Sequence, residues 1–147
     1  MSSSTVHFYT VDVSLNLKSR RLLKTWIKDL VNKENADLIA INFIFCSDSY
    51  LLSMNQEWLQ HDTLTDVITF DLSDKSTKNR LINGEVYISL ERLKANAAEY
   101  KVSVREETCR VMAHGVLHLL GYSDKTSSQK KLMRQKENLY LSLLRNS

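Results

Sequence analysis

The sequence predicts an α+β fold in which a single mixed β-sheet of about four strands carries helices packed on it. The first observation behind this prediction is the order of the segments. Strand-like and helix-like patterns alternate in the first half of the chain, and two strand-like patterns follow each other in the second half. Strands separated by a helix can pair in parallel, whereas consecutive strands can pair antiparallel. The second observation is size and composition: 147 residues, 43% hydrophobic and 25% charged, are typical of one folded domain over residues 1–147.

The first half of the chain contains two strand patterns and two helix patterns. The strands are predicted from alternating or β-branched and aromatic side chains, and the helices from apolar side chains at helical spacing. The expected elements are a strand over 6–15, a helix over 17–32, a strand over 37–46, a helix that begins at Ser47 or Asp48, and a loop over 61–64.

The second half predicts two consecutive strands and then three helices. The expected elements are a strand over 66–72, a polar and basic connection over 73–80, a strand over 85–90, and helices over 91–100, 103–120 and from Thr126 or Ser127 to about 144. Ser103 and Glu106 have the spacing of a capping box, which predicts that the middle helix begins at Ser103.

Composition excludes several classes of protein and predicts the compartment. The chain has no proline and three glycines, which excludes collagen-like and linker-like sequences. A net charge of +3 is too small to identify a nucleic-acid partner. Two cysteines without a disulfide framework indicate free thiols in a reducing compartment. There is no evident signal peptide, and the apolar run over 38–46 is too short to span a bilayer, so we expect a cytoplasmic protein without membrane association.

The chemically informative residues are two histidines, a glycine and an aspartate near the end of the predicted helix 103–120. His114 and His118 are four residues apart, so they project from one face of a helix and can bind one metal ion. Gly121 is placed to end the helix in a left-handed cap, after which Asp124 can return toward the histidines. Two histidines and a carboxylate would leave a fourth coordination position for water. We therefore expect a metal site on this helix and the turn that follows it.

One alternative to this metal site is a structural role for the two histidines, one of them partly buried and the other at the surface. A zinc-protease site is excluded because Gly115 follows His114, where the protease signature requires a glutamate that acts as general base.

The same residues resemble a known signature. The segment His114-Gly-Val-Leu-His118-Leu-Leu-Gly121-Tyr-Ser-Asp124 resembles the pattern His-Gly-x-Leu-His-Leu-x-Gly-Tyr-Asp-His of the YbeY family, the bacterial metal-dependent endoribonucleases of rRNA maturation. The resemblance extends over about residues 40–140. Its further blocks are Met54-Asn55 through Asp62, Thr65-Asp66-Val67-Ile68-Thr69-Phe70, Gly84-Glu85-Val86-Tyr87-Ile88-Ser89, and Met133-x-x-x-Glu137.

This resemblance implies an activity, a cofactor and partners. The implied activity is zinc-dependent endonucleolytic cleavage of single-stranded RNA in 16S rRNA 3′-end maturation and ribosome quality control. The implied partners are the 16S rRNA precursor and the ribosome or its small subunit. One Zn²⁺ per chain would be held by His114, His118 and Asp124; nickel is an alternative, because both metals accept imidazole and carboxylate. The sequence specifies no oligomeric state.

Three departures from the family pattern bear on this expectation. Asp124 stands where the family has its third ligand histidine, and a carboxylate is an acceptable zinc ligand that makes the metal a weaker Lewis acid. Leu59 stands where the family has an arginine, so this chain has no positively charged side chain at that position. His61, two residues further on, could replace the arginine or be a surface residue. Leu64 stands where the family has a proline.

Other residues are candidates for RNA contact or for support of the metal ligands. The sequence identifies no catalytic side chain, and Asp66 is the candidate for a polar group near the ligands or, alternatively, for a strand brace. Basic residues that could follow an RNA backbone are Lys75, Lys78, Arg80, Lys130, Lys131 and Arg134, although such clusters also occur as solvated faces. Two other functions stay open: a non-catalytic ribosome or RNA-binding assembly factor with a structural metal, and a metal hydrolase that acts on another substrate.

Overall fold

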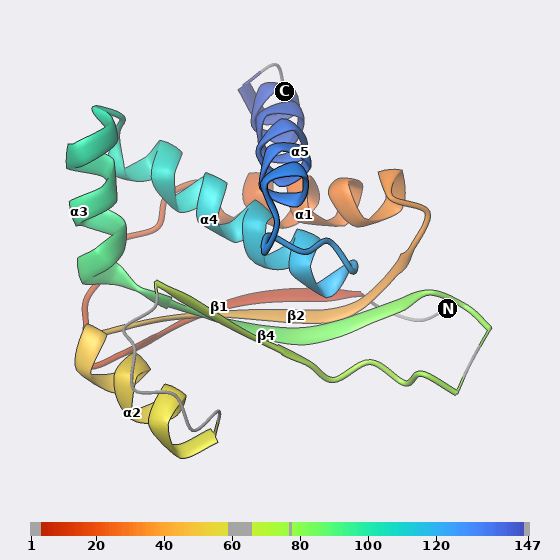
Figure 1. Ribbon diagram of the computed structural model, residues 1–147, viewed down its shortest axis with the longest axis horizontal. Helices are drawn as coiled ribbons and strands as arrows, with labels where there is room; N and C mark the ends of the chain where they lie inside the picture. The colour runs from red at the N-terminus through yellow and green to blue at the C-terminus, as the bar shows by residue number, and fades with distance from the viewer. Residues whose placement is uncertain (1–3, 59–65, 77, 146–147) are drawn as a thin grey trace.

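The framework of the protein is one four-stranded mixed sheet, seen edge-on in Figure 1. The computed structural model describes residues 4–58, 66–76 and 78–145. The strands β1 (Thr5–Val11), β2 (Asp37–Cys46), β3 (Val67–Asp71) and β4 (Leu81–Ser89) lie in the order β1-β2-β4-β3. The pairs β1–β2 and β2–β4 are parallel, and β3 pairs with β4 antiparallel. The predicted α+β class with one mixed sheet is confirmed.

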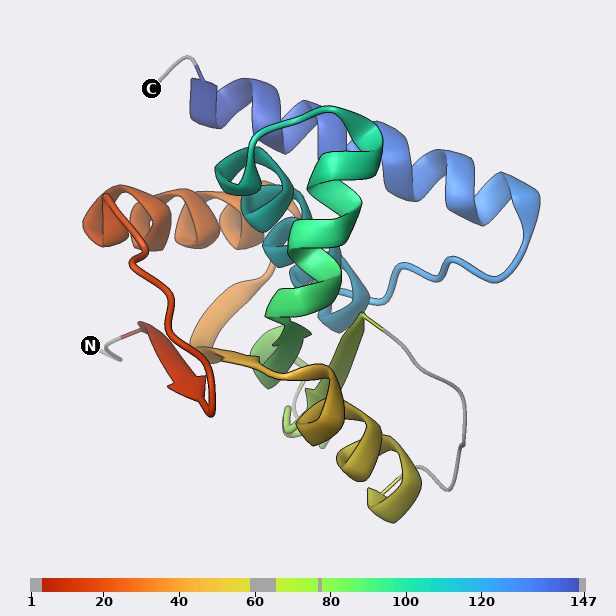
Figure 2. The ribbon, with the colours of Figure 1, turned by 90° about the vertical axis from the view of Figure 1, so that its left-hand side faces the viewer.

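Helices cover the two faces of the sheet unequally. Four of them lie on one side in both views: α1 (Arg20–Lys33), α3 (Leu90–Tyr100), α4 (Val104–Leu119) and α5 (Ser127–Arg145), while α2 (Asp48–Trp58) lies on the other (Figures 1 and 2). The larger hydrophobic core lies between the sheet and the helices α1, α4 and α5. A smaller cluster under α2 contains Cys46, Leu51, Met54 and Ile68. Within the described ranges, every helix is too short or too polar to cross a membrane.

Two predicted strand boundaries were wrong, each for a local reason. The first strand ends at Val11 and not at residue 15, because Asp12 has a left-handed φ of 51° and its carboxylate accepts hydrogen bonds from the backbone N–H and hydroxyl of Ser47. The fourth strand begins at Leu81 and not at residue 85, because its pairing with β2 starts at Asp37. The loop predicted over 61–64 lies outside the described residues.

Helix α4 is the most deeply buried element on the helical side of the sheet. Ten of its 16 residues are buried, and from Glu107 onward only Arg110, His114 and His118 are half-buried. Those three residues are spaced by four, so they form one strip along the helix. The hydroxyl of Ser103 accepts a hydrogen bond from the backbone N–H of Glu106, as the capping box predicts. The fold therefore leaves open only the face of α4 that carries the two histidines.

A glycine allows α4 to pack closely on the sheet. A Cβ atom added at Gly115 would lie 2.6 Å from Cγ1 of Val86 on β4, which is closer than carbon atoms approach in proteins. The valine side chain is β-branched and cannot turn away freely. Residue 115 therefore sets the distance between the metal-site helix and the sheet.

We expect Gly115→Ala to destabilise the protein although alanine is the better helix former. Overpacking costs about 1–3 kcal/mol, and the gain in helix propensity is at most about 1 kcal/mol, so the free energy of unfolding should fall by up to about 2 kcal/mol. Urea unfolding checks this. In a Val86→Ala background the clash disappears, and there Gly115→Ala should be neutral or stabilising. A stabilising effect in the wild-type background would contradict the close contact.

Candidate metal centre

The two histidines and the aspartate meet at the C-terminal end of α4. Nε2 of His114 lies 3.0 Å from Nε2 of His118, and Oδ2 of Asp124 lies 3.3 Å from each of them. Gly121, with φ of 106°, ends the helix as predicted. The backbone N–H groups of Gly121 and Tyr122 donate to the carbonyls of His118 and Leu117, which closes the turn and returns Asp124 to the histidines.

Both imidazole rings are oriented by hydrogen bonds at their other nitrogen. Nδ1 of His114 lies 2.7 Å from Oε2 of Glu137, and Nδ1 of His118 lies 3.0 Å from the carbonyl oxygen of Tyr122. Both partners are acceptors only, so each Nδ1 carries the proton. In the neutral rings each Nε2 therefore presents a lone pair to the other ring and to a carboxylate. A metal ion bound between them, or a proton on one of the rings, would stabilise this arrangement.

The separations of the three ligand atoms fit a metal ion. A tetrahedral site with metal–ligand bonds of about 2.0–2.2 Å places its ligand atoms about 3.3–3.6 Å apart. The separations here are 3.0, 3.3 and 3.3 Å. Among the residues that the structure describes, this trio is the group of histidine, cysteine and acidic side chains that could hold a metal.

The charges around the trio favour a positive charge within it. Burial disfavours the imidazolium form of His114, but the hydrogen bond that its Nδ1–H donates to Glu137 and the nearby carboxylates of Asp124 and Asp66 raise its pKa above the ordinary value. Burial likewise opposes ionisation of Glu137, but its contacts with His114 and Arg110 lower the pKa of this carboxyl group. Glu137 is thus an ionised acceptor held in place from two sides.

A second buried carboxylate anchors the turn that carries Asp124. Glu34, at the end of α1, accepts hydrogen bonds from the hydroxyls of Tyr122 (2.6 Å) and Tyr140 and from Nζ of Lys136 (3.0 Å). Burial alone would raise the pKa of Glu34, yet these donors lower it. The backbone carbonyl of Tyr122 in turn accepts a hydrogen bond from His118. Glu34 is therefore linked through Tyr122 to one of the candidate metal ligands.

The other predicted site residues lie around two cavities, one on each side of the trio. A cavity of about 270 Å³ on the His114 side is lined by Asp66, Lys130 and Arg134, among others. A second cavity, on the His118 side, is lined by Lys75, Lys78 and Arg80. Lys131 is exposed on α5 and belongs to neither of these two cavities.

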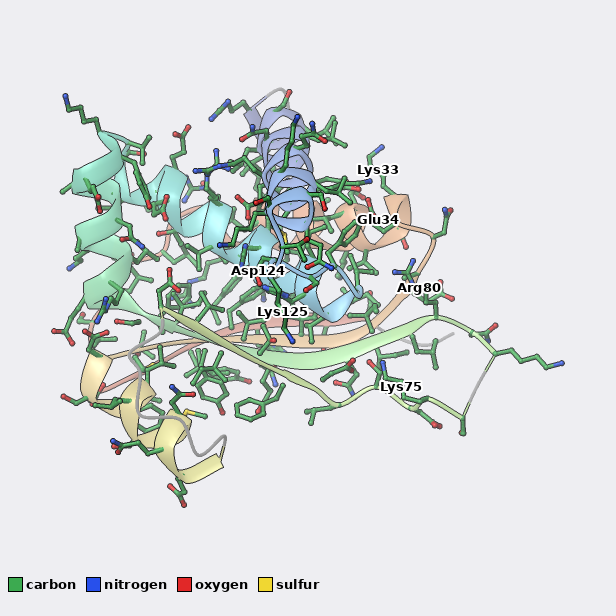
Figure 3. All side chains as sticks on the ribbon, in the orientation of Figure 1. Lys33, Glu34, Lys75, Arg80, Asp124 and Lys125 are labelled. Atoms are coloured by element: carbon green, nitrogen blue, oxygen red, sulfur yellow. The ribbon has the colours of Figure 1, made fainter. Side chains whose placement is uncertain are left out.

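Several of these side chains already have partners in the chain. Arg80 donates to the carbonyls of Glu34 and Leu120, and Figure 3 shows it next to Glu34. Lys75 forms an exposed ion pair with Asp71 on the connection between β3 and β4, away from Asp124 in Figure 3. Asp66 accepts a hydrogen bond from Asn96 at 3.4 Å, while the imidazole Nδ1 atoms are held by Glu137 and Tyr122 instead.

Positions 59, 61 and 64 bear on the predicted departures from the family pattern. Leu59, His61 and Leu64 lie outside the described residues, so the expectations attached to them stay predictions.

Sequence reasoning missed the roles of Glu137 and Glu34. Glu137 was part of a recognised block, but nothing in its spacing indicates that it contacts His114, which is 23 positions away. Glu34 carried a weak signal, because an acidic residue at the C-terminal end of a helix opposes the helix dipole and needs a compensating partner.

Comparison with known proteins shows similarity along almost the whole chain. The family model described as "Endoribonuclease YbeY" matches residues 6–145. The endoribonuclease YbeY of Cytophaga hutchinsonii is 44% identical over 143 residues, which cover 97% of this chain and 98% of that protein. That of Amoebophilus asiaticus is 43% identical, with 96% and 94% covered. The solution structure of TM1509 from Thermotoga maritima superposes with a TM-score of 0.63 at 27% identity, covering 95% of this chain and 89% of that one.

The contact between His114 and Glu137 predicts a pH dependence in the metal-free protein. The raised pKa of His114 stabilises the fold below its ordinary value of 6.5, and this contribution disappears as the pH rises through the folded-state pKa. The lowered pKa of Glu137 stabilises the fold above its ordinary value of 4.5, and this contribution is lost as the pH falls through the folded-state pKa. Both contributions are therefore present between pH 4.5 and 6.5.

We accordingly expect Glu137→Gln to cost more stability near pH 5.5 than near pH 8.5. Urea unfolding in the presence of a chelator, with wild type and variant compared at both pH values, measures the difference. An equal cost at both pH values would show that the charge of His114 does not couple to Glu137.

A matched pair of tyrosines tests the anchor at Glu34. Tyr122→Phe and Tyr140→Phe each remove one hydroxyl donor from the same carboxylate, and each should lower the free energy of unfolding by about 1–3 kcal/mol. Only Tyr122 belongs to the turn between His118 and Asp124. We therefore expect Tyr122→Phe alone to weaken binding of a divalent metal, by several-fold in isothermal titration calorimetry. Equal metal affinities of the two variants would show that Glu34 does not act through the turn.

Proposed function

Because this chain belongs to the endoribonuclease YbeY family, we propose that it is a zinc-dependent endoribonuclease that cleaves single-stranded RNA. The observation that carries the proposal is the trio of His114, His118 and Asp124, whose ligand atoms face one another at tetrahedral spacing. We propose one Zn²⁺ per chain, with nickel as the alternative ion, since both accept imidazole and carboxylate ligands.

The chain itself prepares the ligand atoms for this chemistry. When bound, the metal polarises a phosphoryl oxygen and lowers the pKa of a water molecule. Glu137 and the carbonyl of Tyr122 keep the Nδ1 protons on the rings, which leaves each Nε2 as a ligand. Asp124 adds one negative charge, so two neutral imidazoles and one carboxylate leave a divalent ion with a single net positive charge. That charge still attracts a phosphodiester.

Basic side chains on both sides of the trio suit an RNA strand that crosses it. Lys130 and Arg134 line the cavity on the His114 side, and Lys75 and Lys78 line the one on the His118 side. Arg80 is engaged with two backbone carbonyls, so we assign it to positioning the end of α4. Exposed lysines and arginines contribute a salt-dependent attraction to phosphates without reading sequence. Asp66, at the rim of the first cavity, raises the pKa of His114 through its charge.

The biological role that follows from the family is 16S rRNA 3′-end maturation and ribosome quality control. The proposed partners are the 16S rRNA precursor and the ribosome or its small subunit, and the proposed location is the cytoplasm. These proposals rest on family membership rather than on a contact in the structure.

The proposed activity is tested with variants of the ligands. Wild-type protein should contain bound metal and cleave single-stranded RNA, with activity lost on chelation and restored by Zn²⁺. His118→Ala should lose metal and lower cleavage by about 100-fold or more, because a ligand and its orientation are both removed. Asp124→Ala should weaken metal binding, whereas Asp124→His supplies another zinc ligand and should retain it.

The outcome also separates the alternative functions. Metal content without RNA cleavage would favour an RNA-binding factor with a structural metal. Hydrolysis of other substrates alone would favour a different metal hydrolase. Undiminished RNA cleavage by purified His118→Ala would reveal a contaminating nuclease and overturn the mechanism.

A further inference from the structure

The cavity on the His114 side extends along α4 away from the metal ligands. Its walls come from α3, α4, α5 and the start of β3, and its volume of about 270 Å³ is just below the usual range for small-molecule sites. His114 and Asp124 line the cavity, and Glu107 of α4 lines it as well. The cavity therefore connects the proposed cleavage site to an acidic side chain that no step of the proposed mechanism uses.

Glu107 is a buried carboxylate without a hydrogen-bond partner in the described part of the chain. The residue is 5% exposed and lines the cavity. No described side-chain oxygen is both buried and without a hydrogen-bond partner, so the carboxylate oxygens of Glu107 reach the open space of the cavity. Burial raises the pKa of Glu107, and the positive charges of Arg110 and Arg134 lower it only in part. The nearest arginine on the helix, Arg110, donates instead to Glu137 and Asn138.

Two other buried carboxylates, those of Glu34 and Glu137, have their negative charge compensated by hydrogen-bond donors. Glu34 accepts from two tyrosines and a lysine, and Glu137 contacts a histidine and an arginine. The carboxylate of Glu107 has fewer such contacts and faces a cavity, which points to a ligand with hydrogen-bond donors.

The position of Glu107 suits the nucleotide next to the bond that is cut. Glu107 and His114 are seven residues apart, so they lie on the same face of α4 and about 10.5 Å apart along its axis. A base attached to a phosphate at the trio can extend over such a distance into the cavity. Tyr100, which is 55% exposed at the cavity, presents a ring on which a base can stack. Arg134 and Lys130 stand on the α5 wall, where backbone phosphates would pass.

The chemistry of the cavity selects among possible ligands. A phosphate placed against Glu107 would be repelled. A second metal ion lacks ligands, because within the described ranges only the trio brings metal-binding atoms together. A carboxylate accepts two parallel hydrogen bonds from a group with two adjacent N–H donors, and the Watson–Crick edge of guanine presents its N1–H and its 2-amino group in this way. Uracil offers a single N–H between two carbonyl oxygens, which a carboxylate repels.

We propose that this cavity is a base-binding subsite in which Glu107 recognises guanine in the RNA next to the cleavage site. The proposal rests on the endoribonuclease function proposed above and assigns that activity a preference for one base. Glu107 is the specificity-determining residue, and Tyr100 supplies the stacking surface.

The test measures binding apart from cleavage. The probes are fluorescein-labelled oligouridylates of eight nucleotides. One position carries uridine, guanosine or inosine, and inosine lacks the 2-amino group of guanosine. Fluorescence anisotropy with the metal-free full chain should show roughly tenfold tighter binding of the guanosine probe than of the uridine probe. The inosine probe should lose most of that gain. Glu107→Gln should abolish the preference, because its amide presents an N–H₂ donor to the same edge.

A neighbouring residue supplies the control. Glu106→Gln removes the adjacent charge of the same helix, which pairs with Arg145 outside the cavity, and should retain the guanosine preference. Equal binding of all three probes by wild type, or a preference that survives Glu107→Gln, would overturn the subsite.

Cleavage of the same probes with Zn²⁺ keeps the two proposals separable. Cleavage without base preference would support the endoribonuclease activity and contradict the proposed subsite. A guanosine preference in binding without cleavage of any probe would support the subsite and remove the endoribonuclease activity.

Discussion

The close packing of α4 against the sheet is the constraint on which the site depends. Gly115 lets the helix approach Val86 so closely that no side chain fits between them, and helices α1 and α5 add to the large core around it. A helix buried on nearly all sides presents few positions to solvent. From Glu107 to the end of α4 these are the strip of Arg110, His114 and His118, so the packing that stabilises the fold also determines where the imidazoles point. The glycine at the position of a protease's general base thus has a structural reason.

Buried carboxylates connect this packing to the chemistry. Glu137 reaches His114 from α5, and Glu34 reaches the ligand turn from α1 through Tyr122. Each is ionised at a buried position because donors from other elements surround it, so the two contacts bind α1, α4 and α5 together while they orient the ligands. Glu107 is the contrasting case, since it is also buried but lines a cavity, and Arg110 beside it donates to Glu137 and Asn138 instead. The difference separates groups that hold the protein together from a group available to a ligand.

Local pattern predicted most of the fold and the grouping of His114, His118 and Asp124, because both follow from short-range geometry. Helical spacing placed His114 and His118 on one face, and a glycine with positive φ ended the helix where the pattern indicated. The contacts that orient the ligands could not be predicted in this way. Glu34 and Tyr122 are 88 positions apart and meet only because α1 and the ligand turn pack side by side. The start of β4 was missed for the same reason, since its first residues are strand only through pairing with β2.

One departure from the family pattern changes the charge of the candidate site. Asp124 in place of a neutral histidine adds one negative charge to the trio. In the proposed endoribonuclease, the metal centre itself would therefore attract a phosphodiester less strongly. Lys130 and Arg134 stand at the cavity on one side of the trio, and Lys75 and Lys78 stand at the cavity on the other. Under the proposed function, attraction of the RNA backbone would accordingly be spread along the path of the strand. Binding would then depend more on salt and on the flanking nucleotides than on the scissile phosphate alone.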